Sequence, residues 1–351
     1  MKLPKILNIL DKGQIRALPL IVLAMIIGAG FEVIGLSFII PVMEVITNPS
    51  QSYFLIFLKA HFPAINSNNE KFIVLALFAI FYIIKGVYLT FLAQMSGRFS
   101  FGIKESINKK LMQRYVKGSY EFHLKNNSSK LINNLIKESS YLVDYSLNPI
   151  LLIATESFVI IAMAIFLIWI EPQGSMIVAA LLIIASLAFL GSIKKIIVAL
   201  GKTREFADRK IAQNAQEAIG GIKDIKILSK EDSFIEEFQK YNKQSSDASS
   251  KRFFWHQVSR TYLESIFVLA LSILFILITT TSEAISTKIA TLGVFALATF
   301  RLLPSLNRIL SSLNMLRFSS PTIANIEQQL NEAHDLVDIL SKKNEVETHY
   351  Q

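Results

Sequence analysis

Five runs of apolar residues are each long enough to carry a helix across the hydrocarbon core of a bilayer, which needs roughly 20 such residues. They occupy residues 17–43, 71–95, 145–170, 174–198 and 261–282. A sixth run, 287–316, is interrupted by Arg301, Pro304 and Arg308. We count it as a span because the flanking loops require an even number of crossings. Only 18% of the 351 residues are charged, which is little for the surface of a soluble protein. The sequence therefore predicts an all-α membrane protein with six transmembrane helices.

Lysine and arginine are distributed very unequally between the two sides of the predicted membrane. Four precede the first span, nine lie in residues 98–137 and fourteen in residues 194–260, whereas the opposite side carries only Lys59, Lys71 and Lys288. Basic loops stay in the cytoplasm, so we expect both termini and the two long loops to be cytoplasmic. Residues 1–16 are interpreted as a cytoplasmic N-terminal segment rather than a signal peptide. The net charge of +9 lies beside the apolar runs, which argues against nucleic acid as a partner.

The first long loop carries the pattern of a helical hairpin. Gly118-Ser119 interrupts the chain, a short helix is expected within 119–125, and Asn126-Asn127-Ser128-Ser129 turns the chain back. Before this break, apolar residues recur every four positions, at Phe99, Ile103, Ile107, Leu111 and Tyr115. This spacing predicts an amphipathic helix that continues the second span into the cytosol.

The second long loop repeats this plan. A helix at about 202–219 ends at Gly220-Gly221, a short segment follows to residue 228, and a helix then returns to the membrane. Spans two to five are therefore expected to project well beyond the bilayer. Such extensions could be merely solvated, but connections between membrane helices are usually far shorter.

Metal and thiol chemistry are not expected. The chain contains no cysteine, so it cannot form a disulfide or a zinc–thiolate site. Its five histidines are scattered without the spacing of metal ligands. We predict no metal site.

The six spans, the paired cytoplasmic extensions and the short external links resemble the transmembrane domain of an ABC exporter of the type IV fold. Residues Gln216–Lys226, with the sequence QEAIGGIKDIK, look like the second coupling helix of that family. Residues 119–125 stand where the first belongs. The resemblance implies that the two tips near 119–125 and 220–228 dock on an ATPase, through Tyr120, Phe122, Ile222, Lys223, Asp224 and Ile225. It also implies a homodimer, because six spans enclose half of a translocation path.

Within that family the chain is most similar to the lipid-linked oligosaccharide flippases of bacterial protein glycosylation. Three stretches carry this narrower resemblance: residues 31–36 with Pro41, the Gly-Gly-Ile-Lys-Asp-Ile-Lys tip, and residues 300–309. These flippases have an amphipathic external helix after the first span, which Tyr53, Phe54 and Phe57 would suit here. The resemblance implies a multi-pass protein of the bacterial cytoplasmic membrane and a polyprenyl-pyrophosphate glycan as first candidate substrate.

ATP hydrolysis is not expected on this chain. Gly201-Lys202-Thr203 is no phosphate-binding loop, because Ile196 occupies the position of the required earlier glycine and no strand precedes it. We expect residues 17–318 to form the transmembrane domain and 319–351 a cytoplasmic linker toward a nucleotide-binding domain. ATP and Mg²⁺ would then be bound by that domain or by a partner subunit, and no cofactor by this chain.

Charged residues inside membrane spans are costly and mark candidate functional sites. We predict that four cations line a central cavity and bind an anionic headgroup, since Arg grips phosphate oxygens in pairs; they are Lys85, Arg260, Arg301 and Arg308. The alternative is that some of them pair with Glu32 or Glu156 and hold helices together, or extend toward the interface.

Three other functions remain open at this point. The first is an ABC exporter of another lipid, a peptide or a drug. The second is a secondary carrier driven by an ion gradient, with Glu32 or Glu156 as its proton site. The third is a membrane scaffold that does not transport. The long paired extensions argue against a carrier, which has no need of coupling tips.

Overall fold

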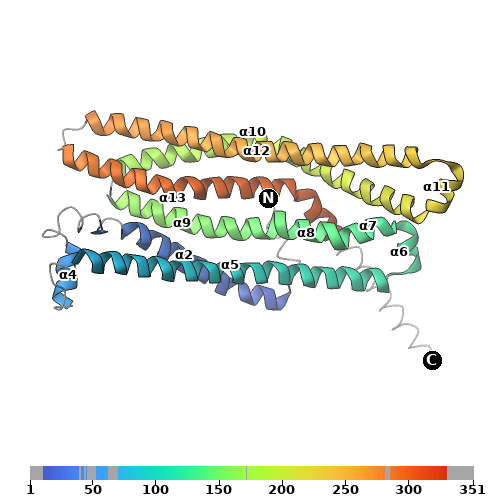
Figure 1. The fold of residues 1–351 in the computed structure, drawn as a ribbon, viewed down its shortest axis with the longest axis horizontal. Helices are drawn as coiled ribbons and strands as arrows, with labels where there is room; N and C mark the ends of the chain where they lie inside the picture. Colours follow the sequence, from blue (N-terminus) through green and yellow to red (C-terminus); the bar gives the residue numbers. More distant parts are fainter. Residues whose placement is uncertain are drawn as a thin grey trace, which may run out of the picture.

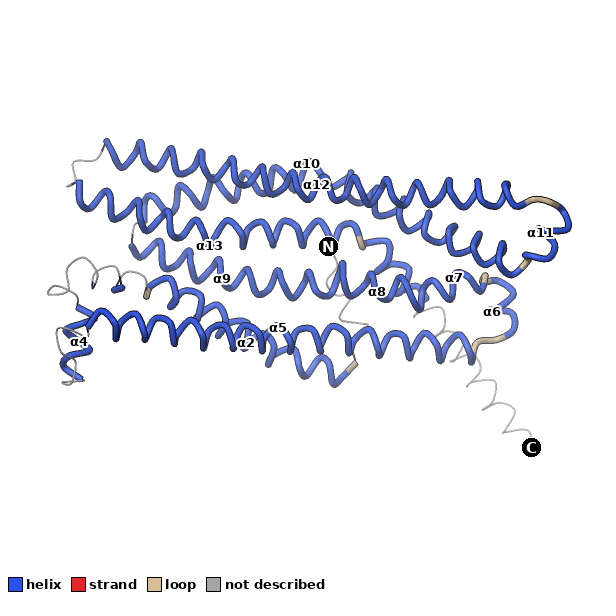
Figure 2. The backbone as a smooth tube through the Cα atoms, in the orientation of Figure 1, coloured by secondary structure: helices blue, strands red, loops and turns tan. Residues whose placement is uncertain are grey.

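The computed structural model describes residues 11–38, 41–42, 45, 53–61, 70–170, 172–280 and 285–329. Helices account for nearly all of these residues, and no strand occurs among them (Figure 2). The predicted all-α class is therefore confirmed.

The first part of the chain contains two long helices, α2 and α5, with the short helices α4 and α6 among its described residues. Helix α2 spans Lys12–Ser37, the short helix α4 spans Tyr53–His61, and α5 runs without interruption over Glu70–Lys117. After the Gly118-Ser119 break, α6 covers Tyr120–Lys125. The hydroxyl of Ser119 accepts a hydrogen bond from the backbone N–H of Phe122, which starts this short helix.

The returning limb of the first hairpin is less regular than the sequence predicts. It comprises α7 (Ser128–Asn133), η2 (Asn134–Glu138), α8 (Ser139–Leu142), η3 (Val143–Leu147) and α9 (Asn148–Ile170), of which η2 and η3 are π-helical. A π-helical turn holds more residues than an α-helical turn, so it shifts the face that the following side chains occupy. The apolar pattern of this segment does not reveal the two π-helical turns.

The second hairpin is formed by the two longest helices. Helix α10 spans Pro172–Gly220, α11 spans Ile222–Leu228 and α12 spans Glu231–Thr280. Helix α13 then covers Ile285–Phe318, and after a turn at Ser319 the chain is again helical over residues 320–329. The short helices α6 and α11 lie in the residue ranges predicted for the tips.

The long helices run side by side along an elongated bundle (Figure 1). Helices α6 and α11 lie at one end of it, and α4 lies at the other. The two hairpins therefore point in the same direction, and α13 runs between them beside α9.

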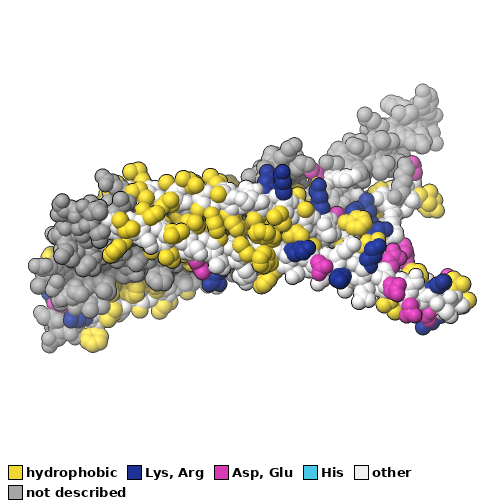
Figure 3. Space-filling model, turned by 90° about the horizontal axis from the view of Figure 1, so that it is seen from above, with side chains coloured by type: hydrophobic (Ala, Val, Ile, Leu, Met, Phe, Trp, Pro, Cys, Tyr) yellow, Lys and Arg dark blue, Asp and Glu magenta, His cyan; other side chains and the backbone are white. Residues whose placement is uncertain are grey.

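Hydrophobic and charged side chains occupy different parts of the bundle's length. Figure 3 shows hydrophobic side chains gathered over much of the bundle and Lys, Arg, Asp and Glu gathered toward the end that carries the tips. Four helical stretches of the described chain are long and apolar enough to span a membrane: Lys12–Gly35, Glu70–Lys117, Ser128–Trp169 and Gly174–Gly220. The fifth and sixth spans fall on α12 and α13, and their crossing of the membrane stays a prediction.

The half of α5 that leads to α6 packs as its four-residue period predicts. Ile103, Ile107, Leu111 and Tyr115 are buried, and Phe99 lies at the edge of the same cluster. The cluster also contains side chains of the returning limb and of the last described segment, including Leu131, Leu142, Val143, Leu147 and Ile326. Burial of this apolar stripe holds the first hairpin together.

Candidate functional site

A three-residue ion cluster joins α2, α5 and α13 within the apolar part of the bundle. The Nζ atom of Lys85 lies 2.8 Å from Oε2 of Glu32, and a guanidinium nitrogen of Arg301 lies 2.7 Å from Oε1 of the same carboxylate. All three side chains are mostly buried. Two cations thus share one anion, which gives the cluster a net charge of +1.

A second ion pair joins α9 and α13. Arg308 Nε donates to Oε1 of Glu156 over 2.6 Å. Arg301 and Arg308 are seven residues apart, so they lie on nearly one face of α13. One face of α13 therefore carries two arginines, Arg301 and Arg308, and each forms an ion pair with a carboxylate from another helix.

Two buried polar atoms of these clusters have no hydrogen-bond partner among the described residues. They are Nε of Arg301 and Oε2 of Glu156. A buried polar group without a partner is costly, and it has unused capacity to bind a ligand or water. The clusters can therefore accept further polar contacts without losing their ion pairs.

The sequence allowed the candidate cations either to line a cavity or to pair with Glu32 or Glu156. Three of the four form such pairs in the structure. Lys85, Arg301 and Arg308 are each paired with Glu32 or Glu156. Arg260 instead pairs with Glu264 one turn further along α12, at 2.9 Å, and both side chains are exposed. Arg260 thus belongs to neither cluster.

At the first tip, the two predicted docking residues differ in exposure. The Tyr120 side chain is 78% exposed, whereas Phe122 is 9% exposed and its ring stacks near Tyr115 of α5, with ring centroids 6.1 Å apart. Phe122 thus anchors α6 to its own hairpin, whereas Tyr120 is exposed on the outside of the tip.

At the second tip, the apolar face available to a partner is wider than the sequence indicates. Ile222, Lys223 and Asp224 are exposed as predicted for docking residues, but Ile225 is buried against its own hairpin. Four apolar side chains are exposed on or next to α11, and we call them the α11 apolar face: Ile219, Ile222, Ile227 and Leu228. Sequence reasoning missed Ile227 and Leu228, although their position directly before the turn at Ser229 is a usable signal.

A groove of about 340 Å³ lies next to the α11 apolar face, between α10, α11 and α12. Its lining is mainly apolar and includes Ile219, Ile222, Ile225, Phe234 and Phe238. The second tip thus combines protruding aliphatic side chains with a hollow beside them.

The segment predicted to lie outside the membrane contains helix α4, at the end of the bundle opposite the tips. One side of this helix packs on the bundle, where Leu55 is buried and Phe54 is partly buried, while Ile56 and Phe57 are exposed. The side chain of Tyr53 lies outside the described residues. Lys59 forms an ion pair with Glu70 at the start of α5, which ties α4 to the bundle.

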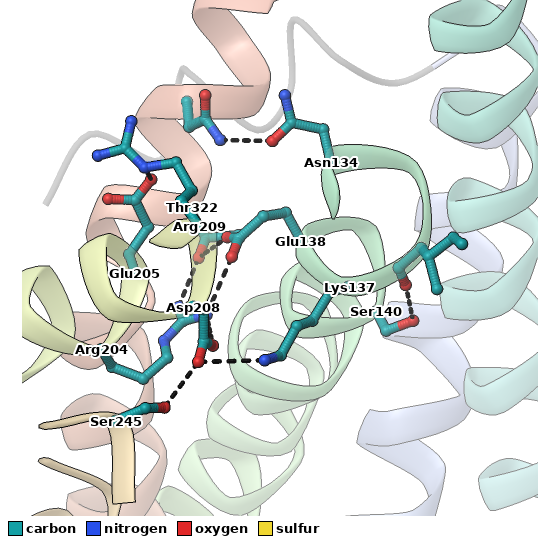
Figure 4. Close-up of polar contacts among 12 residues, drawn as sticks. Asn134, Lys137, Glu138, Ser140, Arg204, Glu205, Asp208, Arg209, Ser245 and Thr322 are labelled. Atoms are coloured by element: carbon teal, nitrogen blue, oxygen red, sulfur yellow. Dashed lines mark hydrogen bonds and ion pairs between the residues drawn. The ribbon is translucent and has the colours of Figure 1, made fainter. Parts of the chain in front are cut away.

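A buried polar network that the sequence analysis did not predict lies between the hairpins (Figure 4). Arg204 of α10 is fully buried. It donates to Glu138 of η2 over 3.0 Å and to the hydroxyl of Thr322 over 2.9 Å. That hydroxyl in turn donates to the other oxygen of Glu138 over 2.6 Å.

The network extends to α12 through Asp208, which lies one turn after Arg204 on α10. Its carboxylate accepts a hydrogen bond from the hydroxyl of Ser245 on α12 over 2.6 Å. It also forms an ion pair with Lys137, whose Nζ atom lies 3.1 Å away. An Arg and an Asp four residues apart normally indicate an exposed helical pair. Here both are buried, and so are the apolar residues Ile197 and Ala207 on the same helix.

Beside this network, burial changes the pKa of a further carboxyl group, that of Glu205. Desolvation raises the pKa of Glu205 above its ordinary value, and the guanidinium of Arg209 partly offsets this. The described part of the chain holds no group of three or more His, Cys, Asp or Glu side chains that could bind a metal ion.

Comparison with known protein families identifies a matching family. The sequence model of the family described as the ABC transporter transmembrane region matches residues 34–302. The matched range covers well over half of the chain. It includes both tips, Glu156 and Arg301, and it begins two residues after Glu32.

Proposed function

Because this chain belongs to the family of ABC transporter transmembrane regions, we propose that it forms the translocation path for an anionic amphipathic lipid, driven by ATP hydrolysis on a nucleotide-binding partner or domain. It is a membrane subunit of an ABC exporter. A polyprenyl-pyrophosphate glycan is the first candidate substrate, and another lipid, a peptide or a drug is the alternative.

The observation that carries the substrate class is the excess positive charge of the Glu32–Lys85–Arg301 cluster. A net charge held inside an apolar bundle is costly unless a counter-ion reaches it. A phosphate oxygen would neutralise the cluster and satisfy Nε of Arg301. Arg308 stands on the same face of α13 and could contact the same headgroup.

The tips support an ATP-driven mechanism. Each cytoplasmic hairpin ends in a short helix that exposes apolar or aromatic side chains to solvent. Exposed apolar patches of this kind mark sites of protein association. We propose that a nucleotide-binding domain covers both tips and that two copies of the chain assemble around one path in the bacterial cytoplasmic membrane.

The experiment is substrate-stimulated ATP hydrolysis by the assembled transporter in nanodiscs, with a polyprenyl pyrophosphate as probe. Arg301→Gln should raise the concentration needed for half-maximal stimulation about tenfold or more, as expected for the loss of one charge-assisted contact. Lys195→Gln, which removes an exposed cation from α10, is the control and should leave it unchanged.

Arg260→Gln is tested in the same series. The sequence predicts Arg260 as a headgroup ligand, but its side chain is exposed and belongs to neither ion cluster, so this variant should keep the affinity of the unaltered protein. Stimulation by the uncharged polyprenol as strong as by its pyrophosphate would contradict an anionic substrate. If the Arg301→Gln protein folds and its affinity for the polyprenyl pyrophosphate is unchanged, the Glu32–Lys85–Arg301 cluster is not part of the substrate site.

A further inference from the structure

The buried Arg204 network joins four segments that are far apart in the sequence. Arg204 and Asp208 come from α10, Glu138 from η2, Ser245 from α12 and Thr322 from the segment 320–329 (Figure 4). These segments are limbs of both hairpins together with the continuation of α13. The network is therefore a point at which all of them are held together.

The polar side-chain atoms of the network have partners among the described residues, except Nε of Arg204, which is buried without one. The hydroxyl of Thr322 accepts from Arg204 and donates to Glu138, so its hydrogen is used. The ring of Tyr141 covers the guanidinium of Arg204, whose central carbon lies 3.9 Å from the ring centroid. Arg204 and Lys137 balance the charges of Glu138 and Asp208. A neutral and bonded cluster of this kind specifies one arrangement of its segments, and loss of one member leaves a buried charge unpaired.

The segment 320–329 connects this network to the first tip. Ile326 is fully buried in the apolar cluster of the first hairpin. Asn325 donates to Asn134 over 2.8 Å, and the hydroxyl of Tyr115 donates to Gln329 over 3.4 Å. Tyr115 in turn stacks near Phe122 of α6. Contacts therefore run from Arg204 through this segment to the base of α6.

The other branch runs along α10 to the second tip. Helix α10 is continuous from Arg204 to Gly220, directly before α11. Three residues before Arg204, Gly201 brings α10 against the end of α13, where a Cβ atom would lie 2.1 Å from the carbonyl oxygen of Phe318. Backbone contact and buried charges thus hold α10 at the same place.

We propose that Arg204 is a positioning residue, which fixes the tips α6 and α11 relative to each other and to the segment 320–329. The two hairpins then respond as one body when force is applied at either tip. The consequence for transport rests on the proposed function, whereas the effect on the tips does not.

The first experiment measures the distance between the tips without any ATPase. The sequence contains no cysteine, so Tyr120→Cys with Lys223→Cys gives two unique sites for spin labels, both exposed. Labelled chain is diluted into excess unlabelled chain, so that a dimer carries one labelled copy, and pulsed electron paramagnetic resonance on the full chain in nanodiscs then gives the distribution of distances between the two labels. Arg204→Gln should broaden this distribution about twofold, because the hairpins lose their shared anchor.

Two further variants make this test specific. Thr322→Val keeps the volume of the side chain and removes only its hydroxyl, so it should broaden the distribution even if Arg204→Gln does not fold. Arg209→Gln removes another arginine of α10, whose pairing with Glu205 is local and partly exposed, and should leave the distribution unchanged. An unchanged distribution in the folded Thr322→Val protein would overturn the proposal.

The second experiment asks whether this positioning serves coupling. In the assembled transporter, Thr322→Val should raise the ATP consumed per substrate moved about threefold or more, with substrate affinity unchanged. Absence of any ATP-driven transport in the unaltered protein would refute the proposed function and leave the distance measurement intact. A broadened distribution with an unchanged ATP ratio would overturn the link to coupling.

Discussion

Single residues decide how closely the helices of this bundle approach one another. Gly201 is the clearest case, because α10 meets the carbonyl group of Phe318 there with no space for a side chain. Gly191, on the same helix, has nothing within 4 Å of the place where a Cβ would stand. The two glycines look alike in the sequence, and only the packing of α13 distinguishes them.

Gly201→Ala is therefore expected to destabilise the protein by about 1–3 kcal/mol, because the clash must be relieved by separating two backbones. The measurement is the thermal unfolding temperature in detergent, which should fall. Gly191→Ala is the matched control, and it should be neutral or slightly stabilising because alanine favours the helix. Equal unfolding temperatures for both variants would contradict the close contact.

The start of α2 is held to α5 by a carboxylate that titrates. A hydrogen bond from Lys110, 2.6 Å away, and a second from Ser106 lower the pKa of the Asp11 carboxyl from its ordinary value of 3.8. A lowered pKa means that the ionised form stabilises the contact. This stabilisation is fully present above the ordinary pKa and is lost as the pH falls through the lowered value.

A spin label at Lys12→Cys should therefore become more mobile as the pH falls below about 4. The energy involved is about 1 kcal/mol or less, because both side chains are substantially exposed to solvent. Asp11→Asn should show the mobile spectrum already at neutral pH. If the spectrum of the label in the protein that keeps Asp11 does not change down to pH 2, the carboxylate does not anchor the start of α2.

At the scale of elements, the hairpin tips differ in what they offer a partner. Helix α6 exposes Tyr120 and keeps Phe122 for its own packing, whereas α11 exposes an aliphatic face next to a groove. The left-handed backbone of Ser229, with φ of 49°, ends α11 directly after Leu228. This turn leaves Ile227 and Leu228 at the extremity of the hairpin.

Leu228→Asp is expected to weaken binding of the proposed nucleotide-binding partner by about tenfold or more, since it places a charge in an apolar contact. The dissociation constant is measured by surface-immobilised binding in detergent. Met112→Asp, at an exposed apolar position on α5, is the control. Similar losses in both variants would show that the α11 apolar face has no special part in docking.

Elements also differ in how well their pattern predicts them. The four-residue period of α5 and the glycine breaks at both tips predict helices that the structure contains, because propensity and periodicity act over a few residues. The π-helical segments η2 and η3 were not predicted. They place Asn134, Glu138 and Ser146 in the interior. Such placement depends on distant partners, which are Arg204 of α10 and residues of the segment that follows α13, Ser319, Thr322 and Asn325.

At the scale of the whole molecule, six crossings would place Lys59 and position 282 on one side of the membrane and the tips on the other. Single cysteines can be placed without interference from native ones. A membrane-impermeant maleimide applied outside intact cells should label Lys59→Cys and a cysteine at position 282, and should not label Lys223→Cys. Labelling of position 282 only after the cells are opened would contradict the fifth and sixth crossings.

The sequence by itself determined that this chain forms long apolar helices with amphipathic extensions and short helical tips. Hydropathy, periodicity and helix breakers are properties of neighbouring residues, so they can be read without knowing the fold. Only the tertiary structure decided which charges meet. Glu32 pairs with Arg301, Glu156 with Arg308, and Arg204 with Glu138 and Thr322, all across large distances in the sequence. These pairings depend on the rotation and depth of each helix in the bundle, and packing of the complete set of helices sets both.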